Sequence, residues 1–116
     1  MIAVIFELIP KAGMESRYFD HAATLGKILP EMEGFISVER FESLVNKGKY
    51  LSLSFWRDEA AVKGWRERME HRGAQADGRA HVFEDYRLRV AHVVRDYGLN
   101  ERSEAPVDSK EAHPHP

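Results

Sequence analysis

The chain has 116 residues, 43% of them apolar, and its 17 basic and 19 acidic residues leave a formal net charge of −2. This length predicts a single small domain, and the near balance of charge argues against a surface dedicated to nucleic acid or to an anionic membrane. The sequence contains no cysteine, which excludes disulfides, thiol nucleophiles and thiolate metal sites.

Residues 2–9 predict a first strand that is apolar on both of its faces. A strand with one solvated face would alternate apolar and polar residues, so we expect both sides of this strand to be covered. Glu7 is the exception, a carboxylate among apolar neighbours. The segment has no basic leader and ends at Pro10, so it reads as a strand and not as a signal peptide. No stretch approaches the ~20 apolar residues of a membrane span, and we expect a cytoplasmic protein.

A helix and a strand pair follow. Apolar residues at helical spacing predict a helix over about residues 14–29. Residues 35–43 alternate like a strand, and the alternation places Phe35 and Phe41 on the same face. A turn signal separates this strand from residues 49–56, which predict its hairpin partner.

A second amphipathic helix is the segment on which the functional question depends. It begins at Asp58, which can accept a hydrogen bond from a free N–H of the first turn, and runs to His71. Val62, Trp65 and Met69 fall on one stripe, so Trp65 points inward. His71 lies near the helix end, where its ring faces either the same cavity or water. The question is whether Trp65 and His71 line a ligand pocket or only close a core.

The last part of the chain predicts one more strand and a tail. Residues 71–83 contain Gly73 and Gly78 and predict a broken or second short helix. A strand then runs from Phe83 to about Tyr97, longer than the usual five or six residues, so we expect it to reach past its own subunit. Residues 99–116 are polar and contain proline, which predicts a flexible tail beyond a domain of residues 1–98.

The order of these elements, β-α-β-β-α-β, is that of the ferredoxin-like α+β fold, a four-stranded antiparallel sheet with two helices on one face. The opposite face of such a sheet is bare, yet the first strand is apolar there too. A homodimer in which two sheets cover each other would bury that face.

Several stretches narrow this common topology. They are EGFISVERFESL, NKGKYLSLSFW and FEDYRLRVAHVVRDYG, together with Trp56 and Trp65 nine positions apart, His71-Arg72, Gln75 and Gly78-Arg79. In this order and spacing they resemble the antibiotic biosynthesis monooxygenase (ABM) domain family over about residues 1–98. The resemblance implies a dimeric α+β barrel. It also implies activities such as cofactor-independent oxygenation of polycyclic phenols or, in a haem-degrading branch, oxidative opening of haem.

The resemblance assigns roles residue by residue. Trp65 matches the helix tryptophan that lines the pocket in both branches. His71 stands where the polyketide-oxidising branch has a tyrosine; an imidazole with a reference pKa of ~6.5 can deprotonate a phenol, and the phenolate can give an electron directly to oxygen. In the haem-degrading branch the iron-binding histidine falls near Gln75 and a strand-one asparagine falls at Glu7, and neither matches. We expect no metal and no cofactor; if haem binds, His71 is the candidate axial ligand.

Each candidate also has a purely structural interpretation. Trp65 fits a core position on an amphipathic helix. His71 fits the end of a helix, where it can interact with free carbonyls. Glu7 can act as a pocket acid or pair with Arg87 or Arg89 on a neighbouring strand.

Three functions are compatible with these residues. The first is a dimeric monooxygenase that uses O₂ on an aromatic or other electron-rich apolar small molecule held between the sheet and the helices. The second is a haem-degrading monooxygenase with a separate electron donor, and the third is a non-catalytic small-molecule binding or stress-associated module. The candidate catalytic residues are His71, Trp65 and Glu7, and the candidate substrate contacts are Trp65, Phe6, Arg87 and Arg89.

Overall fold

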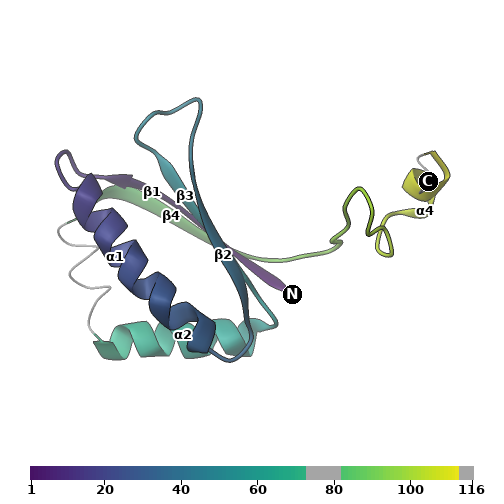
Figure 1. Cartoon of the computed structure of the whole chain (residues 1–116), viewed down its shortest axis with the longest axis horizontal. Helices are drawn as coiled ribbons and strands as arrows, with labels where there is room; N and C mark the ends of the chain where they lie inside the picture. Colours follow the sequence, from purple (N-terminus) through teal and green to yellow (C-terminus); the bar gives the residue numbers. More distant parts are fainter. Residues whose placement is uncertain (73–81, 113–116) are drawn as a thin grey trace.

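The computed structural model describes residues 1–72 and 82–112, without the side chains of residues 70–72 and 112. Its elements follow the expected order along the chain (Figure 1). They are β1 (Ile2–Pro10), α1 (Glu15–Ile28), the short 3₁₀ helix η1 (Leu29–Glu31), β2 (Phe35–Glu42), β3 (Tyr50–Trp56), α2 (Glu59–Arg72), β4 (Phe83–His92) and α4 (Val107–Ala112). Residues 73–81, most of the segment predicted as a broken or second short helix, lie outside the described residues.

The four strands form one sheet in the order β2-β3-β1-β4, and each neighbouring pair is antiparallel. Figure 1 shows α1 and α2 on the same side of this sheet. The predicted ferredoxin-like α+β fold is therefore confirmed. Because side chains alternate along a strand, β1 presents Val4 and Phe6 toward the helices and Ile5 and Glu7 to the other side. We call these two sides the inner and the outer face.

The core lies between the inner face and the helices, in two clusters. One joins β1 and β3 to η1 and α2, and its buried members are Ile2, Leu29, Trp56 and Ala61. The other joins β1 to α1, and its buried members are Leu8, Tyr18 and Ala22. Apolar residues at helical spacing on α1 therefore face the sheet, as their periodicity predicts.

A register shift alters the start of β2. The pairing of β2 with β3 slips between Phe35 and Ser37, so two residues of β2 occupy the place of one. Phe35 consequently packs against the inner cluster with its ring centroid 5.4 Å from that of Trp56, while Phe41 lies on the outer face. The prediction that Phe35 and Phe41 share a face is wrong, because the alternation of residue types does not reveal that β2 carries one extra residue.

Asp58 fixes the start of α2. Its Oδ1 accepts a hydrogen bond from the backbone N–H of Ala61 at 2.9 Å, and its Oδ2 accepts one from Arg57 Nε at 3.1 Å. These interactions, the bond from Ala61 first, lower the pKa of the Asp58 carboxyl below its ordinary value. The capping role predicted for Asp58 is confirmed.

The strand β4 ends at His92, so the predicted extension to Tyr97 is wrong. The limit is set by its neighbour, because β1 begins at Ile2 and that residue already pairs with His92. The next backbone N–H, that of Val93, donates to the carbonyl oxygen of Met1 at 3.0 Å, and the ladder stops there.

The segment after β4 makes local hydrogen bonds. Asp96 N donates to Glu104 Oε1 at 3.0 Å, and Arg102 Nη1 donates to the Gly98 carbonyl at 3.2 Å while its guanidinium lies over the Tyr97 ring. Figure 1 shows this segment running away from α1 and α2 and ending in α4.

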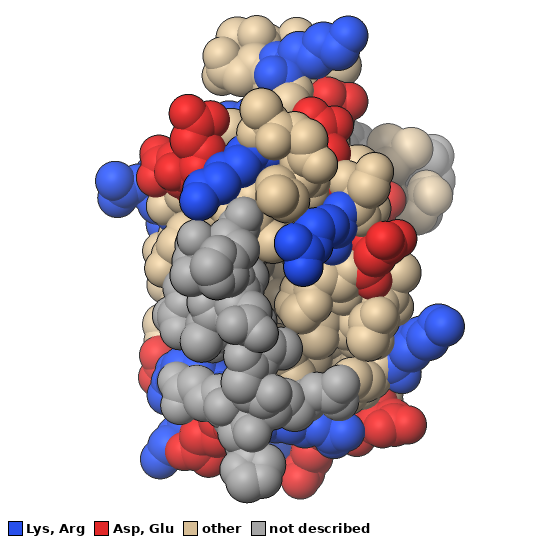
Figure 2. Space-filling view, turned by 90° about the vertical axis from the view of Figure 1, so that its left-hand side faces the viewer, with Lys and Arg blue, Asp and Glu red and all other residues tan. Residues whose placement is uncertain are grey.

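Charged side chains of both signs are interspersed on the face drawn in Figure 2. The pattern agrees with the near balance of charge in the sequence. Among the described helices, none has the length and apolar character that crossing a membrane requires.

Candidate active site

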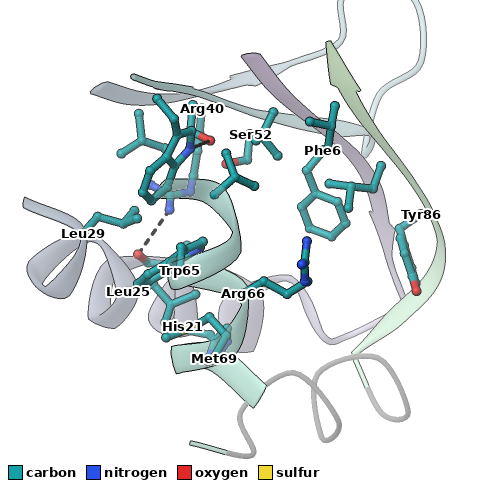
Figure 3. Close-up of a pocket in the computed structure, with 18 of the residues that line it drawn as sticks. Phe6, His21, Leu25, Leu29, Arg40, Ser52, Trp65, Arg66, Met69 and Tyr86 are labelled. Atoms are coloured by element: carbon teal, nitrogen blue, oxygen red, sulfur yellow. Dashed lines mark hydrogen bonds between the residues drawn. The ribbon is translucent and has the colours of Figure 1, made fainter. Parts of the chain in front are cut away.

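A cavity of about 340 Å³ lies between the inner face and the two helices. Its size is at the lower end of the range for small-molecule sites. All four strands, α1, η1 and α2 contribute to its wall, and Figure 3 shows labelled residues from the sheet and from both helices around the same space. Phe83, Tyr86, Leu88 and Val90 of β4 line it. Tyr86, Leu88 and Val90 are about half exposed, so the cavity opens along this edge strand.

Most of the wall is apolar or aromatic. The rings of Trp56 and Trp65 lie at a centroid distance of 6.1 Å, and Trp56 is held in place by the hydrogen bond from its Nε1 to Ser54 Oγ at 3.0 Å. On the other side, the ring of Phe6 makes edge contacts with Phe83 and Tyr86, each at 5.6 Å. Such a wall suits a ligand with an apolar or aromatic body.

Two polar groups are buried at the junction of the wall with α1. Arg40 on β2 donates from Nη2 to the carbonyl oxygen of Ala22 at 3.3 Å (the dashed line in Figure 3). Its Nε and the hydroxyl of Tyr18 are both buried, and neither has a hydrogen-bond partner of good geometry among the described residues. Burial raises the pKa of Tyr18, and the charge of the neighbouring Arg40, together with a hydrogen-bond interaction from its side chain, opposes part of that rise.

The remaining polar residues of the wall give the cavity a positive character. Arg66, His21 and Ser52 reach it from α2, α1 and β3 (Figure 3). Ser54 of β3 also lines it. No aspartate or glutamate is among the described residues that line it. The described side chains also include no group of three or more histidines and carboxylates able to hold a metal ion.

The residues proposed from the sequence divide between the two faces. Trp65 and Phe6 line the cavity. Glu7 lies on the outer face, where its Oε2 accepts a hydrogen bond from Arg89 Nη1 at 3.0 Å, and Arg87 is its register partner. The alternation of β1 and β4 therefore turns Glu7, Arg87 and Arg89 away from the cavity.

The backbone of His71 belongs to the last turn of α2, the helix that carries Trp65. Its side chain, like Gln75, is outside the described residues.

Sequence reasoning missed His21, Arg40 and Tyr18 as site residues. Tyr18 fits the apolar face of α1, and His21 lies three positions after Tyr18 and four before Leu25, so helical spacing alone could have drawn attention to it. For Arg40 the available signal was its place in an alternating strand beside Val38, a residue that faces the core.

Comparisons with known proteins agree with this architecture. The model of the family described as "Antibiotic biosynthesis monooxygenase" matches residues 1–77. Jasmonate monooxygenase ABM of Pyricularia oryzae is 42% identical over 112 residues, which make up 96% of this chain and 52% of that protein. The chain thus spans about half the length of this relative.

Two solved structures share the fold. Rv0793 from Mycobacterium tuberculosis superposes with a TM-score of 0.73 at 15% identity, covering 84% of this chain and 98% of that one. A mutant of SnoaB from Streptomyces nogalater, a cofactor-independent oxygenase, gives a TM-score of 0.69 at 10% identity, covering 82% and 94%. At these identities the likeness concerns the fold alone.

Proposed function

Because this chain belongs to the antibiotic biosynthesis monooxygenase family, we propose that it is a monooxygenase that uses O₂ on an aromatic or other electron-rich apolar small molecule. The observation that carries this proposal is the cavity of about 340 Å³ with Trp56, Trp65 and Phe6 in its wall. A space of this size and character can hold a small apolar body and exclude most of the water around it.

The chemistry requires a base and a substrate that can supply electrons. In the simplest balanced form, a CH₂ group activated by neighbouring π-systems loses a proton, gives an electron to O₂, and ends as a carbonyl with release of one water molecule. All four electrons then come from the substrate. The protein has to bind the substrate, accept the proton and limit access of water, and no metal or flavin is needed for this stoichiometry.

Two histidines are candidates for the proton acceptor. His71 is the residue that the sequence favours, through its spacing from Trp65. His21 has its side chain in the cavity wall, which supports it on geometry. We assign the proton acceptor to His21 and retain His71 as the alternative, because a base must lie within hydrogen-bond reach of the proton that it removes.

Jasmonate, the substrate in the name of the Pyricularia oryzae relative, is the first compound to test. Purified protein and jasmonate are incubated with ¹⁸O₂, with and without an added reductant, and the products are analysed by mass spectrometry. Incorporation of one labelled oxygen atom supports the proposal. Hydroxylation of an unactivated C–H bond consumes two further electrons, so dependence on the reductant distinguishes it from the cofactor-independent reaction.

Absence of labelled product from jasmonate and from a panel of electron-rich phenols and anthrones would contradict the proposal. If these compounds bind without turnover, the non-catalytic binding module is the better description.

The haem-degrading alternative needs an axial ligand and a separate electron donor. His21 is the histidine in the described part of the wall, and His71 is the ligand that the sequence suggests. Titration of the protein with haem tests this alternative, because a shifted Soret band at stoichiometric haem would support it. We propose the haem-free reaction, because SnoaB, which shares the fold, is a cofactor-independent oxygenase.

We also propose that two copies of the chain pair through their outer faces. Ile5, Leu51, Leu53 and Phe55 lie half-buried there, and Phe41 is 43% exposed. A second sheet packed on this surface would remove its apolar side chains from water. Light scattering coupled to size-exclusion chromatography measures the expected dimer directly.

A further inference from the structure

Two polar side chains, Arg40 and Tyr18, interrupt the largely apolar wall of the cavity. Arg40 extends from β2 across the inner face to α1, where one of its N–H groups is used by the Ala22 carbonyl. Its Nε and the Tyr18 hydroxyl remain buried and without a partner of good geometry among the described residues. Buried donors without acceptors are costly, and they are uncommon in folded proteins unless a ligand or water completes them.

The charge of Arg40 is also uncompensated. Arg40 forms no ion pair among the described residues, although other arginines of the chain do, such as Arg57 with Glu33 and Asp58 and Arg89 with Glu7. No described carboxylate lines the cavity, and Arg66 adds a second cation to its wall. A guanidinium in a largely apolar space favours binding of an anion that can approach it.

From this geometry we propose that Arg40 and Tyr18 form a carboxylate-binding subsite at the α1 side of the cavity. A carboxylate accepts from the Nε–H of Arg40 and from the hydroxyl of Tyr18. The apolar remainder of the ligand then lies along Phe6 and Trp65 toward the open edge at β4. This inference rests on the proposed function, since it takes the ligand to be the substrate, and it narrows the substrate class to small apolar carboxylic acids.

The state of Tyr18 supports its role as a donor. Burial raises the pKa of Tyr18, so its hydroxyl keeps its proton throughout the neutral range. Its ring is fixed by contacts with Phe83 and Tyr50 at centroid distances of 6.0 Å each. A fixed, protonated hydroxyl beside a guanidinium is preorganised to bind an anion.

The test compares acids with their methyl esters, which keep the apolar body and remove the negative charge. Jasmonate, decanoate and 1-naphthaleneacetate, each paired with its methyl ester, are titrated into the 116-residue chain by isothermal calorimetry. We expect at least one acid to bind about tenfold or more tightly than its ester, the minimum expected of a charge-assisted hydrogen bond.

Three variants test whether Arg40 and Tyr18 cause the preference for the acid over its ester. Arg40→Met keeps an apolar stem and should weaken binding of the acid about 10–100-fold while leaving the ester unchanged. Tyr18→Phe removes only the hydroxyl and should weaken the acid by a smaller factor. Arg17→Met changes the net charge equally from an exposed position of α1 and should leave the acid-to-ester ratio as in the wild type.

Melting temperatures of all variants separate ligand binding from folding. If Arg40 only supports the fold, Arg40→Met lowers the melting temperature and weakens acid and ester alike, and the proposal is wrong. It is equally wrong if none of the three acids is preferred over its ester by the wild type. Turnover is a separate readout: an acid that binds through Arg40 but is not oxidised leaves the subsite established and contradicts only the monooxygenase proposal.

Discussion

A Cβ atom placed on Gly34 would lie 2.5 Å from the Cβ of Ala61, so the chain that enters β2 packs directly against the start of α2. Gly34 also has a φ of +81°, and its carbonyl accepts a hydrogen bond from Arg57 N at 2.8 Å. Replacing Gly34 with alanine should therefore destabilise the protein by about 2–4 kcal/mol, through steric overlap and backbone strain together. Urea unfolding measures the change.

Gly48→Ala is the matched control. Gly48 has a similar φ of +87°, but an added Cβ there meets none of the described atoms within 4 Å. We expect it to cost only the backbone part, about 1 kcal/mol. Equal losses in the two variants would show that the contact with Ala61 is unimportant.

The Asp58 cap predicts a specific dependence of stability on pH. Its folded-state pKa is lowered by the hydrogen bonds from Ala61 and Arg57, so the folded protein favours the charged carboxylate. Asp58 thus contributes stability above its unfolded pKa of about 3.9, and this contribution is lost as pH falls through the lower folded value. Asp58→Ala should lower the melting temperature by about 5 °C at pH 7, and the difference from the wild type should shrink toward pH 3. A difference independent of pH would contradict this account.

Replacing the two candidate histidines separately should identify the proton acceptor. If His21 accepts the proton, His21→Ala should lower kcat by about 10²–10⁴-fold with a smaller change in KM. His71→Ala should then retain most of the turnover, and circular dichroism should show both variants folded. The reverse result would transfer the role to His71, and unaffected turnover in both would exclude a histidine base.

The outer face offers a test of dimer formation. Leu53 lies at the centre of that face, opposite Ile5 in the register of β3 with β1. Leu53→Asp would bury a charge between two sheets and should convert the dimer into monomers in light scattering. Leu44→Asp, in the fully exposed turn between β2 and β3, is the control and should not change the molar mass. A wild type that is already monomeric would contradict the proposed assembly.

The sequence predicted the helices and strands and their order along the chain, because hydrophobic periodicity distinguishes a helix from a strand at each segment. It predicted that Trp65 points inward for the same reason, since the residue lies on the stripe with Val62 and Met69. It did not predict the end of β4 at His92, because that limit depends on where the neighbouring strand begins. Nor did it single out Arg40, since the role of a charged residue in a strand depends on its register against other strands and on the helix opposite it.

The placement of Glu7 shows the same limitation. The sequence left open whether this carboxylate serves the pocket or pairs with an arginine, and only the register that brings it to Arg89 places it on the outer face.

The two tryptophans of the chain, Trp56 and Trp65, are its only indoles, and both line the cavity. With their ring centroids 6.1 Å apart, their intrinsic fluorescence originates beside whatever occupies that space. The molecule thus carries its own optical reporter: occupancy can be followed from indole emission without a label. Single Trp→Phe variants would show which of the two indoles reports a bound compound.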